Sequence, residues 1–498
     1  MSIKSFAAKI FAKTVRKKIK KWANNPVETQ EKVFQQLINQ AKNTAFGKEH
    51  NFTAIHTHKD FSEQVPVRDY EALKPYIDRV VAAEADILWP GKPLYFAKTS
   101  GTTSGAKYIP LTKASMPTHI EGARNAILNY IAETGENKFV DGKMIFLQGS
   151  PVMGSTNGIK TGRLSGIVAH YVPAYLQKNR LPSWETNCIE DWEEKVEAII
   201  KETLPEKMSV ISGIPSWVQM YFEKIQQQTN KSISEVFPDF KLFIYGGVNF
   251  EPYRAKFNQL IGKTIPSIEL YPASEGFFAF QDKQNNPGML LRLNAGIFYE
   301  FIKADEFDTA APKRYTIGEV EVNVNYVMII STNAGLWAYN LGDTIMFTST
   351  QPYRILVSGR IKHFTSAFGE HVIAKEVEHA LKETIATTNA SVNEFSVAPQ
   401  TNPTSGLPYH EWFIEFDQEP DDIEAFALRL DENMQKQNSY YLDLIQGNIL
   451  RPLVITKIAP KGFQAYMKSI GKLGGQNKVA RLANNRNIAD ALKPWYKK

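Results

Sequence analysis

The chain has 498 residues, of which 43% are hydrophobic and 22% charged, which is the composition of a globular protein with about two to four domains. Its one cysteine, Cys188, excludes intrachain disulfides and metal sites built on several cysteines, and suits a reducing compartment. The net charge of +6 does not indicate a nucleic-acid-binding protein: residues 1–22 hold eight Lys/Arg and no Asp/Glu, and the rest carries 50 basic and 52 acidic side chains.

Residues 1–22 predict a basic amphipathic helix, in which Ile3, Phe6, Ile10 and Phe11 lie near helical spacing. Such a helix either lies in solvent, docked or frayed, or rests on an anionic membrane surface, and both interpretations stay open. The stretch lacks the continuous apolar segment and cleavage site of a secretory signal, and no run of about 18 apolar residues occurs in the chain. We therefore expect a cytoplasmic protein with no transmembrane segment.

Apolar runs that alternate with amphipathic segments predict an α/β fold for the large N-terminal part. A helix is expected over 33–41, with Gly47 as a stop signal. The further expected elements are buried strands at 143–148, 208–211 and 241–245, and helices at 191–201 and 216–228, the last with Ser216 as its cap after Pro215.

The pattern changes from Glu319, where apolar and polar residues alternate up to Tyr326 and predict a half-exposed strand in a more antiparallel region. Beyond about residue 360 we expect a smaller α+β domain with helices at 375–383 and 421–435 and strands at 392–398, 411–416 and 453–458. The chain is thus predicted to have two domains, residues 1–358 and residues 359–498.

The most distinctive motif is Thr99-Ser-Gly-Thr-Thr-Ser-Gly-Ala-Lys107, in which seven of nine residues are Gly, Ser or Thr. Backbone N–H groups and hydroxyls in such a segment can surround phosphate oxygens, and Lys107 can add a positive charge. The spacing does not fit a Walker A loop. Taken alone, the segment could equally be a flexible Ser/Gly loop.

Three further segments carry candidate chemistry. Glu275, in Tyr271-Pro-Ala-Ser-Glu275, is predicted near a strand end, where a carboxylate can hold Mg²⁺ together with nucleotide phosphates. Tyr339-Asn-Leu-Gly-Asp343 predicts a turn whose carboxylate could accept hydrogen bonds from ribose hydroxyls. Gly359-Arg-Ile-Lys-His-Phe-Thr-Ser-Ala-Phe-Gly369 then leads into Glu376-Val-Glu378. Each is a weak signal by itself, because loop carboxylates and Gly-Asp turns are common.

Together the four motifs resemble those of the adenylate-forming superfamily of acyl-CoA synthetases, peptide-synthetase adenylation domains and luciferases. The family pattern T-S-G-T-T-G-x-P-K is similar to 99–107, with the second Gly displaced by one and Pro replaced. Y-G-x-T-E resembles 271–275 with two departures, and Y-x-x-G-D matches 339–343 fully. Within the superfamily the chain looks most like the GH3 acyl-acid amido synthetases, because 273–275 reads A-S-E and 474–481 resembles Q-x-K-x-P-R with Ala480 in place of Pro.

The resemblance implies a large adenylation domain with mixed sheets flanked by helices, a small mobile α+β C-terminal domain and a hinge at Lys362. It implies use of ATP and Mg²⁺ to activate a carboxylic acid as an acyl-adenylate, and transfer of the acyl group to an amine such as an amino acid. Lys478 would contact the α-phosphate, with Lys472, which follows Gly471, as the alternative. No partner beyond these substrates and no nucleic acid is expected, and the protein is expected to be a monomer.

The remaining site residues follow from the same resemblance. The expected ATP- and AMP-binding residues are Ser100, Gly101, Thr102, Thr103, Ser104, Lys107, Tyr271, Ala273, Ser274, Glu275, Asp343 and Arg360, with Glu275 as the Mg²⁺ ligand. Trp217, Gly246 and Gly247 are expected to shape the acyl pocket, although core packing is an equal interpretation. An acyl-CoA synthetase is the alternative function, and a catalytically idle nucleotide-binding protein is the alternative from another class.

Overall fold

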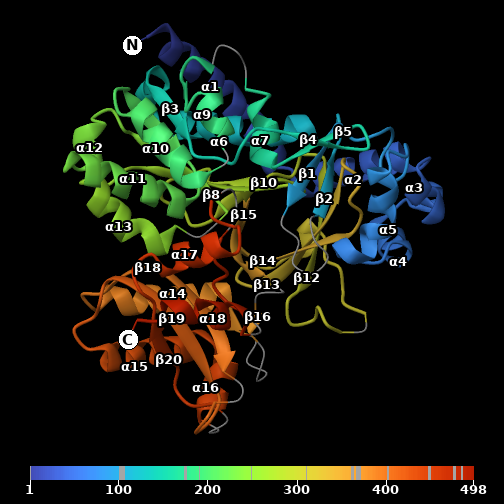
Figure 1. Cartoon of the computed structure of the whole chain (residues 1–498). Helices are drawn as coiled ribbons and strands as arrows, with labels where there is room; N and C mark the ends of the chain where they lie inside the picture. The colour runs from blue at the N-terminus through green and yellow to red at the C-terminus, as the bar shows by residue number, and fades with distance from the viewer. Residues whose placement is uncertain are drawn as a thin grey trace. The chain divides into compact units, whose positions relative to one another are not determined.

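The structure is a computed structural model that describes residues 2–99, 107–172, 177–189, 191–247, 250–309, 311–360, 364–365, 372–400, 403–446, 450–474, 478–483 and 486–497 (Figure 1). The chain forms two compact units. Unit 1 comprises Met1–Val248, Asn258–Leu341 and Ile345–Leu356, and unit 2 comprises Asn249–Phe257, Gly342–Thr344 and Val357–Lys498. The division at 358/359 expected from the sequence stays a prediction, as does the hinge at Lys362, which lies outside the described residues.

Helices and strands alternate over most of the chain up to residue 360. The helices are α1 (Ile3–Ala23), α2 (Pro26–Ala41), α3 (Ala45–Glu49), η1 (Phe52–Ala54), α4 (His58–Gln64), α5 (Tyr70–Val81), α6 (Met116–Thr134), η2 (Lys138–Asp141), α7 (Leu164–Ala169), α9 (Trp184–Cys188), α10 (Trp192–Thr203), α11 (Pro215–Thr229), α12 (Ile233–Val236), α13 (Glu251–Ile261) and η3 (Ile317–Glu319). The strands are β1 (Tyr95–Thr99), β2 (Lys107–Leu111), β3 (Lys143–Phe146), β4 (Gly154–Thr156), β5 (Ile159–Gly162), β6 (Arg180–Leu181), β7 (Met208–Ser212), β8 (Leu242–Gly246), β9 (Ser267–Ala273), β10 (Gly276–Phe280), β11 (Met289–Leu291), β12 (Ile297–Lys303), β13 (Asn325–Thr332), β14 (Tyr339–Thr350) and β15 (Tyr353–Arg360).

One large mixed sheet organises this part of the chain. Its strand order is β12-β13-β14-β15-β11-β10-β9-β8-β7-β3-β6, and β6, β3, β7, β8 and β9 run parallel. The pairs β9–β10, β10–β11, β11–β15 and β12–β13 are antiparallel. A second sheet has the order β2-β1-β5-β4. Mixed sheets flanked by helices confirm the predicted α/β class.

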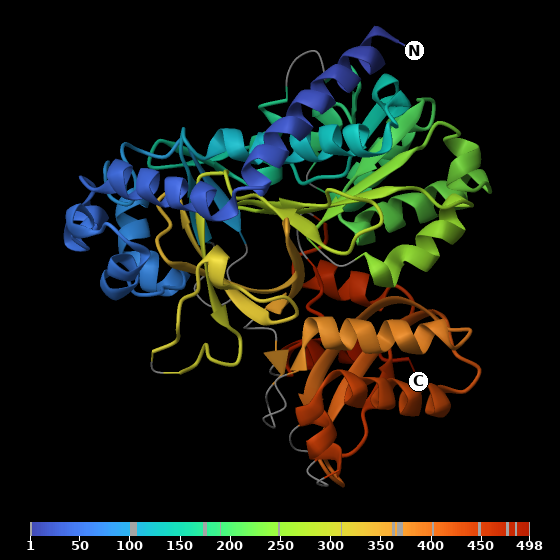
Figure 2. The same ribbon diagram turned by 180° about the vertical axis from the view of Figure 1, so that it is seen from behind.

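Helices α1 and α6 pack together against strands of the parallel region (Figure 2). Ala12, Val15 and Ile19 of α1 are buried in the same hydrophobic cluster as Val210 of β7 and Leu242 of β8. Each fully buried aliphatic side chain stabilises the fold by about 1.5–3 kcal/mol. The amphipathic N-terminal helix predicted from the sequence is therefore present and docked through one face.

Unit 2 has its own sheet and its own core. Strands β18 (Ser391–Gln400), β19 (Tyr409–Gln418) and β20 (Val454–Lys457) form one sheet, with β18 antiparallel and β20 parallel to β19. The other elements are β16 (Phe364–Thr365), β17 (Val372–Ile373), α14 (Ala374–Ala386), α15 (Ile423–Gln437), α16 (Ser439–Gln446), α17 (Gly462–Ser469), α18 (Asn487–Leu492) and η5 (Lys493–Trp495). Trp412 of β19 is buried in the core that α14 and α15 complete.

Four local expectations are wrong. Gly47 lies inside α3, and the preceding helix already ends at Ala41. Helix α11 begins at Pro215 with Ile214 as the N-cap, because a proline at the first position loses no hydrogen bond there. The segment 319–324 is not a regular strand, since Asn323 has φ 65 and interrupts the extended backbone before β13. The motif 339–343 is not a turn but the beginning of β14.

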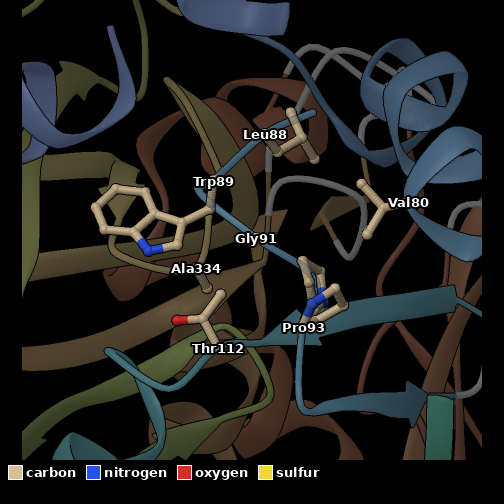
Figure 3. A pocket seen from close by; sticks show the side chains of 8 residues that line it. Val80, Leu88, Trp89, Gly91, Pro93, Thr112 and Ala334 are labelled. Atoms are coloured by element: carbon tan, nitrogen blue, oxygen red, sulfur yellow. The ribbon is translucent and has the colours of Figure 1, made fainter. Parts of the chain in front are cut away.

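A small cavity lies in unit 1 between α5 and the segment that follows it (Figure 3). Val80, Trp89, Pro93 and Ala334 contribute to its apolar lining. Its volume of about 10 Å³ suits a single water molecule, so it cannot hold a nucleotide or an acyl group.

Among the helices that the structure describes, none has the length and apolarity needed to cross a bilayer.

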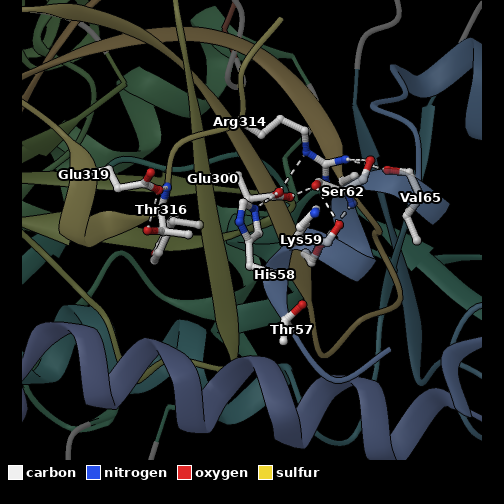
Figure 4. Close-up of polar contacts among 12 residues, drawn as sticks. Thr57, His58, Lys59, Ser62, Val65, Glu300, Arg314, Thr316 and Glu319 are labelled. Atoms are coloured by element: carbon white, nitrogen blue, oxygen red, sulfur yellow. Dashed lines mark hydrogen bonds and ion pairs between the residues drawn. The ribbon is translucent and has the colours of Figure 1, made fainter. Parts of the chain in front are cut away.

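A buried ion cluster joins helix α4 to strand β12 (Figure 4). The Glu300 carboxylate is fully buried and lies 2.7 Å from Nε2 of His58, and Arg314 Nη1 donates to the carbonyls of Ser62 and Val65. Burial alone would raise the pKa of Glu300, but the charge of Arg314 and the hydrogen bonds from His58 and Arg314 hold that pKa below its ordinary value. The cluster is therefore an ionised structural centre.

Candidate active site

Three predicted site segments follow neighbouring parallel strands at their carboxyl ends. Trp217 lies on α11, which follows β7, while Gly246 and Gly247 lie at the end of β8. Glu275 is the second residue after β9. Because β7, β8 and β9 are adjacent and parallel, these segments meet at one edge of the sheet. The carboxyl edge of parallel strands is where open α/β sheets usually bind ligands, so this edge is the candidate site.

The hairpin of β9 and β10 presents Glu275 on a tight turn. Ala273 pairs with Gly276, so only Ser274 and Glu275 connect the two strands. Ser274 is buried, whereas Glu275 is partly exposed. Tyr271 is buried on β9, and its ring contacts Phe278 edge-on at 5.0 Å between centroids. The carboxylate therefore stands at the sheet edge on a short, well-packed support.

Backbone approach is close where β8 meets β9. A Cβ atom added to Gly246 would lie 2.5 Å from the Leu270 carbonyl oxygen and 3.2 Å from Cδ of Pro272. Gly247 has φ 83, a conformation that other residues rarely adopt. Both glycines are thus explained by the backbone path. Trp217 is 5% exposed and packs in the core. Its role in an acyl pocket stays a prediction.

The Ser/Thr-rich motif begins and ends on paired strands. Thr99, the last residue of β1, pairs with Lys107, the first of β2. Nζ of Lys107 lies 5.3 Å from the ring centroid of Tyr70, and the Tyr70 hydroxyl accepts a hydrogen bond from the Tyr108 amide at 2.9 Å. Burial raises the pKa of Tyr70, which therefore stays neutral. Ser100, Gly101, Thr102, Thr103 and Ser104 lie outside the described residues.

The predicted ribose-binding carboxylate belongs to unit 2. Asp343 lies on β14 and is only 6% exposed, and Gly342 before it has φ 81. Thr344, the next residue, accepts a hydrogen bond from the Ser358 hydroxyl at 3.0 Å, which ties β14 to β15. Arg360 is the last residue of β15. Asp343 and Arg360 therefore sit on neighbouring strands of one sheet and not on loops.

The E-x-E pair beyond these strands has structural partners in unit 2. Oε2 of Glu376 accepts hydrogen bonds from the Ile373 amide at 2.9 Å and from Asn438 at 3.0 Å, and burial raises the pKa of Glu376. Glu378 lies 3.7 Å from Nε of Arg481. Both carboxylates therefore help to hold α14 in place within unit 2.

Both candidate lysines lie in unit 2 and are exposed. Lys472 follows helix α17, and its amide donates to the Met467 carbonyl. Lys478 begins a described segment that pairs with β18: the Val397 amide donates to the Arg481 carbonyl at 2.9 Å, and the Ser396 hydroxyl donates to the Ala480 carbonyl at 2.7 Å. Lys478 thus lies three residues before a fixed point, Arg481.

Arg481 is the anchor of that segment. Its guanidinium donates to the Phe395 carbonyl at 3.1 Å, pairs with Glu394, contacts the Tyr253 hydroxyl and lies above the Phe395 ring. A guanidinium can bond to several acceptors at fixed angles, which a lysine cannot. The arrangement explains why an arginine ends the C-terminal motif.

No sequence pattern predicts two buried basic side chains, Arg292 and His119, beside the Glu275 hairpin. Arg292 donates to the carbonyls of Phe277 and Thr118 at 3.2 and 2.9 Å, and burial lowers its pKa to about 10. His119 is buried nearby, and burial, with the charge of Arg292, lowers its pKa to about 4, so it is neutral. Arg292 thereby fixes β10 two residues after Glu275. The contacts join positions 118, 277 and 292, which are too far apart in the chain for a local pattern to reveal them.

Comparison with known proteins gives matches along nearly the whole chain. Residues 15–186 and 179–266 match the GH3 family N-terminal domain, 290–360 the GH3 family central domain and 375–487 the GH3 family C-terminal domain. The jasmonoyl–L-amino acid synthetase JAR4 of Nicotiana attenuata is 22% identical over 386 residues, which are 64% of this chain and 66% of that protein. The indole-3-acetic acid-amido synthetase GH3.2 of Arabidopsis thaliana is 32% identical over 92 residues, 18% of this chain and 17% of that protein.

Two solved structures share the fold. The GH3.15 acyl acid amido synthetase has a TM-score of 0.80 at 14% identity, over 96% of this chain and 95% of that chain. A 2-hydroxyisobutyryl-CoA ligase has a TM-score of 0.60 at 14% identity, over 93% of this chain and 90% of that chain. The alignment with JAR4 spans slightly less than two thirds of that relative's length, and the alignment with GH3.2 about a sixth.

Proposed function

Because this chain belongs to the GH3 family, we propose that it is an ATP-dependent acyl-acid amido synthetase. It would activate a carboxylic acid as an acyl-adenylate and transfer the acyl group to an amine, with amino acids as the first acceptors to test. The observation that carries the proposal is the ordered match of three family domains, together with a curated relative that is named an amino acid synthetase.

The proposed chemistry has two steps. An oxygen of the substrate carboxylate attacks the α-phosphorus of ATP, and pyrophosphate leaves. The amine nitrogen then attacks the acyl carbon, AMP leaves, and the proton lost from the amine passes to solvent. The protein must align the carboxylate oxygen with the phosphorus and neutralise the charge that develops there. None of the residues assigned below acts as a covalent nucleophile.

The proposed residue roles follow the family resemblance. Ser100, Thr102 and Thr103, with Gly101 and Ser104, would donate hydrogen bonds to the β- and γ-phosphates, and Lys107 would supply a positive charge. Tyr271, with Ala273 and Ser274, would border the adenine, and Asp343 would accept hydrogen bonds from the ribose with Arg360 nearby. Lys478 would contact the α-phosphate. The anchored neighbour Arg481 supports this choice over Lys472.

The donor set suits a nucleotide-bound Mg²⁺. Among the described residues no group of three or more His, Cys, Asp or Glu side chains could enclose a metal ion. Mg²⁺ is commonly held by one or two carboxylates plus substrate phosphates, and the partly exposed Glu275 at the sheet edge fits that pattern. The ion would neutralise phosphate charge when bound. Glu275 would hold it in position.

A thioester-forming CoA ligase is the competing function, since such an enzyme shares this fold at a TM-score of 0.60. Pyrophosphate release should be measured with a panel of carboxylic acids, each crossed with amino acids and with CoA. We expect an acid-dependent signal that amino acids accelerate and that excess EDTA abolishes. If CoA alone accelerates pyrophosphate release, the product is a thioester and not an amide. If none of the acids causes pyrophosphate release, the ligase proposal is wrong. The cytoplasmic location and the monomeric state stay predictions.

A further inference from the structure

Helix α1 has one face that packs on the protein and an opposite face that does not. Ala12, Val15, Ile19 and Ala23 are spaced by three, four and four residues and are buried against unit 1. The opposite stripe consists of Phe6, Ile10, Lys13, Lys17 and Lys21, at spacings of four, three, four and four, and every one of these side chains is exposed. We call this stripe the outer face of α1.

The outer face combines large apolar side chains with positive charge. Phe6 is 60% exposed and Ile10 55%, and Phe11 beside them is 52% exposed. No aspartate or glutamate occurs before Glu28 in the sequence, so no side chain of α1 neutralises its lysines. The apolar residues lie in the first half of the helix, and the three lysines lie from its middle residue, Lys13, onward. Nothing in the packing of α1 explains either group, because its buried stripe already holds the helix in place.

This combination suits the surface of a membrane. An interfacial helix immerses apolar side chains at the boundary between headgroups and acyl chains, while its lysines contact anionic headgroups. The helix has 21 residues and is about 31 Å long, so it can lie flat over several lipids. A nucleic acid would use the lysines but would leave Phe6, Ile10 and Phe11 without a role. We propose that the outer face of α1 binds anionic membrane surfaces.

Vesicle sedimentation with the purified full-length protein tests the proposal. The protein should bind vesicles of equimolar phosphatidylglycerol and phosphatidylcholine at least ten-fold more tightly than vesicles of phosphatidylcholine alone, and added salt should weaken the binding. Each lysine near an anionic surface contributes a factor of about five, so Lys13→Gln/Lys17→Gln/Lys21→Gln should weaken binding by about 100-fold. Phe6→Ser/Ile10→Ser should weaken it by at least ten-fold without removing charge.

A matched control separates the outer face from net charge. Lys59→Gln/Lys313→Gln/Lys493→Gln removes the same charge at exposed positions elsewhere and should bind vesicles as the wild type does. All variants should keep the wild-type melting temperature, because the altered side chains are exposed. Equal loss in the control triple variant, or no preference for the anionic vesicles, would overturn the proposal. The proposal would also be overturned, in favour of a nucleic acid, if the protein bound an oligonucleotide more tightly than anionic vesicles and Phe6→Ser/Ile10→Ser left the affinity for the oligonucleotide unchanged.

Discussion

Arg314 holds the buried carboxylate of Glu300 by two parallel hydrogen bonds, with Nε 2.8 Å from Oε1 and Nη2 2.6 Å from Oε2. Both partners are nearly inaccessible to solvent. A buried carboxylate keeps its charge only when the surrounding groups compensate for the loss of water. The contact therefore fixes β12 to α4, because the same guanidinium also bonds to backbone carbonyls at Ser62 and Val65.

Arg314→Met should lower the free energy of unfolding by about 3–5 kcal/mol, because it leaves Glu300 buried without its main countercharge. Urea denaturation followed by circular dichroism measures this loss. Glu300 has a lowered pKa in the folded state, so its ionic contribution is present above the ordinary glutamate pKa and is lost as the pH falls through the folded value. Lys32→Met, which breaks an exposed pair with Glu28, should cost less than about 1 kcal/mol. Equal losses in the two variants would contradict this account.

Lys195 should make stability depend on pH in the alkaline range. Its side chain is buried on α10 and donates to the Asn187 carbonyl at 2.6 Å, and burial lowers its pKa from 10.5 to about 8. Between these values the unfolded chain binds more protons than the folded one, so wild-type stability should rise with pH relative to Lys195→Met. Denaturation curves collected from pH 7 to 11 give the difference. The exposed Lys201→Met on the same helix is the control, and parallel curves for wild type and Lys195→Met would refute the prediction.

Lys107→Ala should weaken the use of ATP with little loss of stability. A charged hydrogen bond to phosphate is worth about 1.5–3 kcal/mol, so KM for ATP should rise by roughly 10- to 100-fold. The contact with the Tyr70 ring is worth only about 0.5–1 kcal/mol, so the melting temperature should change little. Steady-state pyrophosphate release and thermal melting measure the two effects. The control variant Lys113→Ala removes an exposed charge just after β2 and should change neither the KM for ATP nor the melting temperature. If Lys107→Ala greatly lowers the melting temperature and leaves the ATP kinetics unchanged, Lys107 has a structural role.

Lys478→Ala should slow formation of the acyl-adenylate by about 100-fold, because it removes a charge that acts on the transition state. Reaction of a supplied acyl-adenylate with the amine should continue at the wild-type rate. Single-turnover assays of the two half-reactions separate these effects. Lys472→Ala is the matched control, since it removes an exposed lysine six residues away. If Lys472→Ala blocks adenylation and Lys478→Ala does not, the assignment reverses.

Most helices and strands were predictable from the sequence, but the strands and side chains that they contact were not. Apolar runs at 143–148, 208–211 and 241–245 identify β3, β7 and β8, because strands buried on both faces need continuous apolar residues. The beginning of β14 was predicted as a turn because Gly342-Asp343 has turn composition, although the strand continues through a glycine at positive φ.

The contacts that support the site join residues far apart in the chain, so no pattern of spacing reveals them. Tyr70 lies beside Lys107, and Tyr253 lies beside Arg481. The placement of Asp343 on a buried strand also depends on pairing between β14 and β15, which composition does not specify. The motifs nonetheless identified the family, because their order along the chain is more specific than any one of them.

The C-terminal segment 480–483, here called the tail, pairs with strand β18. β18 is an outer strand of its sheet, ten residues long, and the tail covers part of its free edge through bonds to Ser396 and Val397. An uncovered strand edge offers unpaired N–H and C=O groups to other chains and promotes aggregation. Deleting the tail would therefore expose the edge of β18, through which copies of the protein could pair with one another. The C-terminal segment protects the protein against intermolecular strand pairing, whatever its lysine contributes to chemistry.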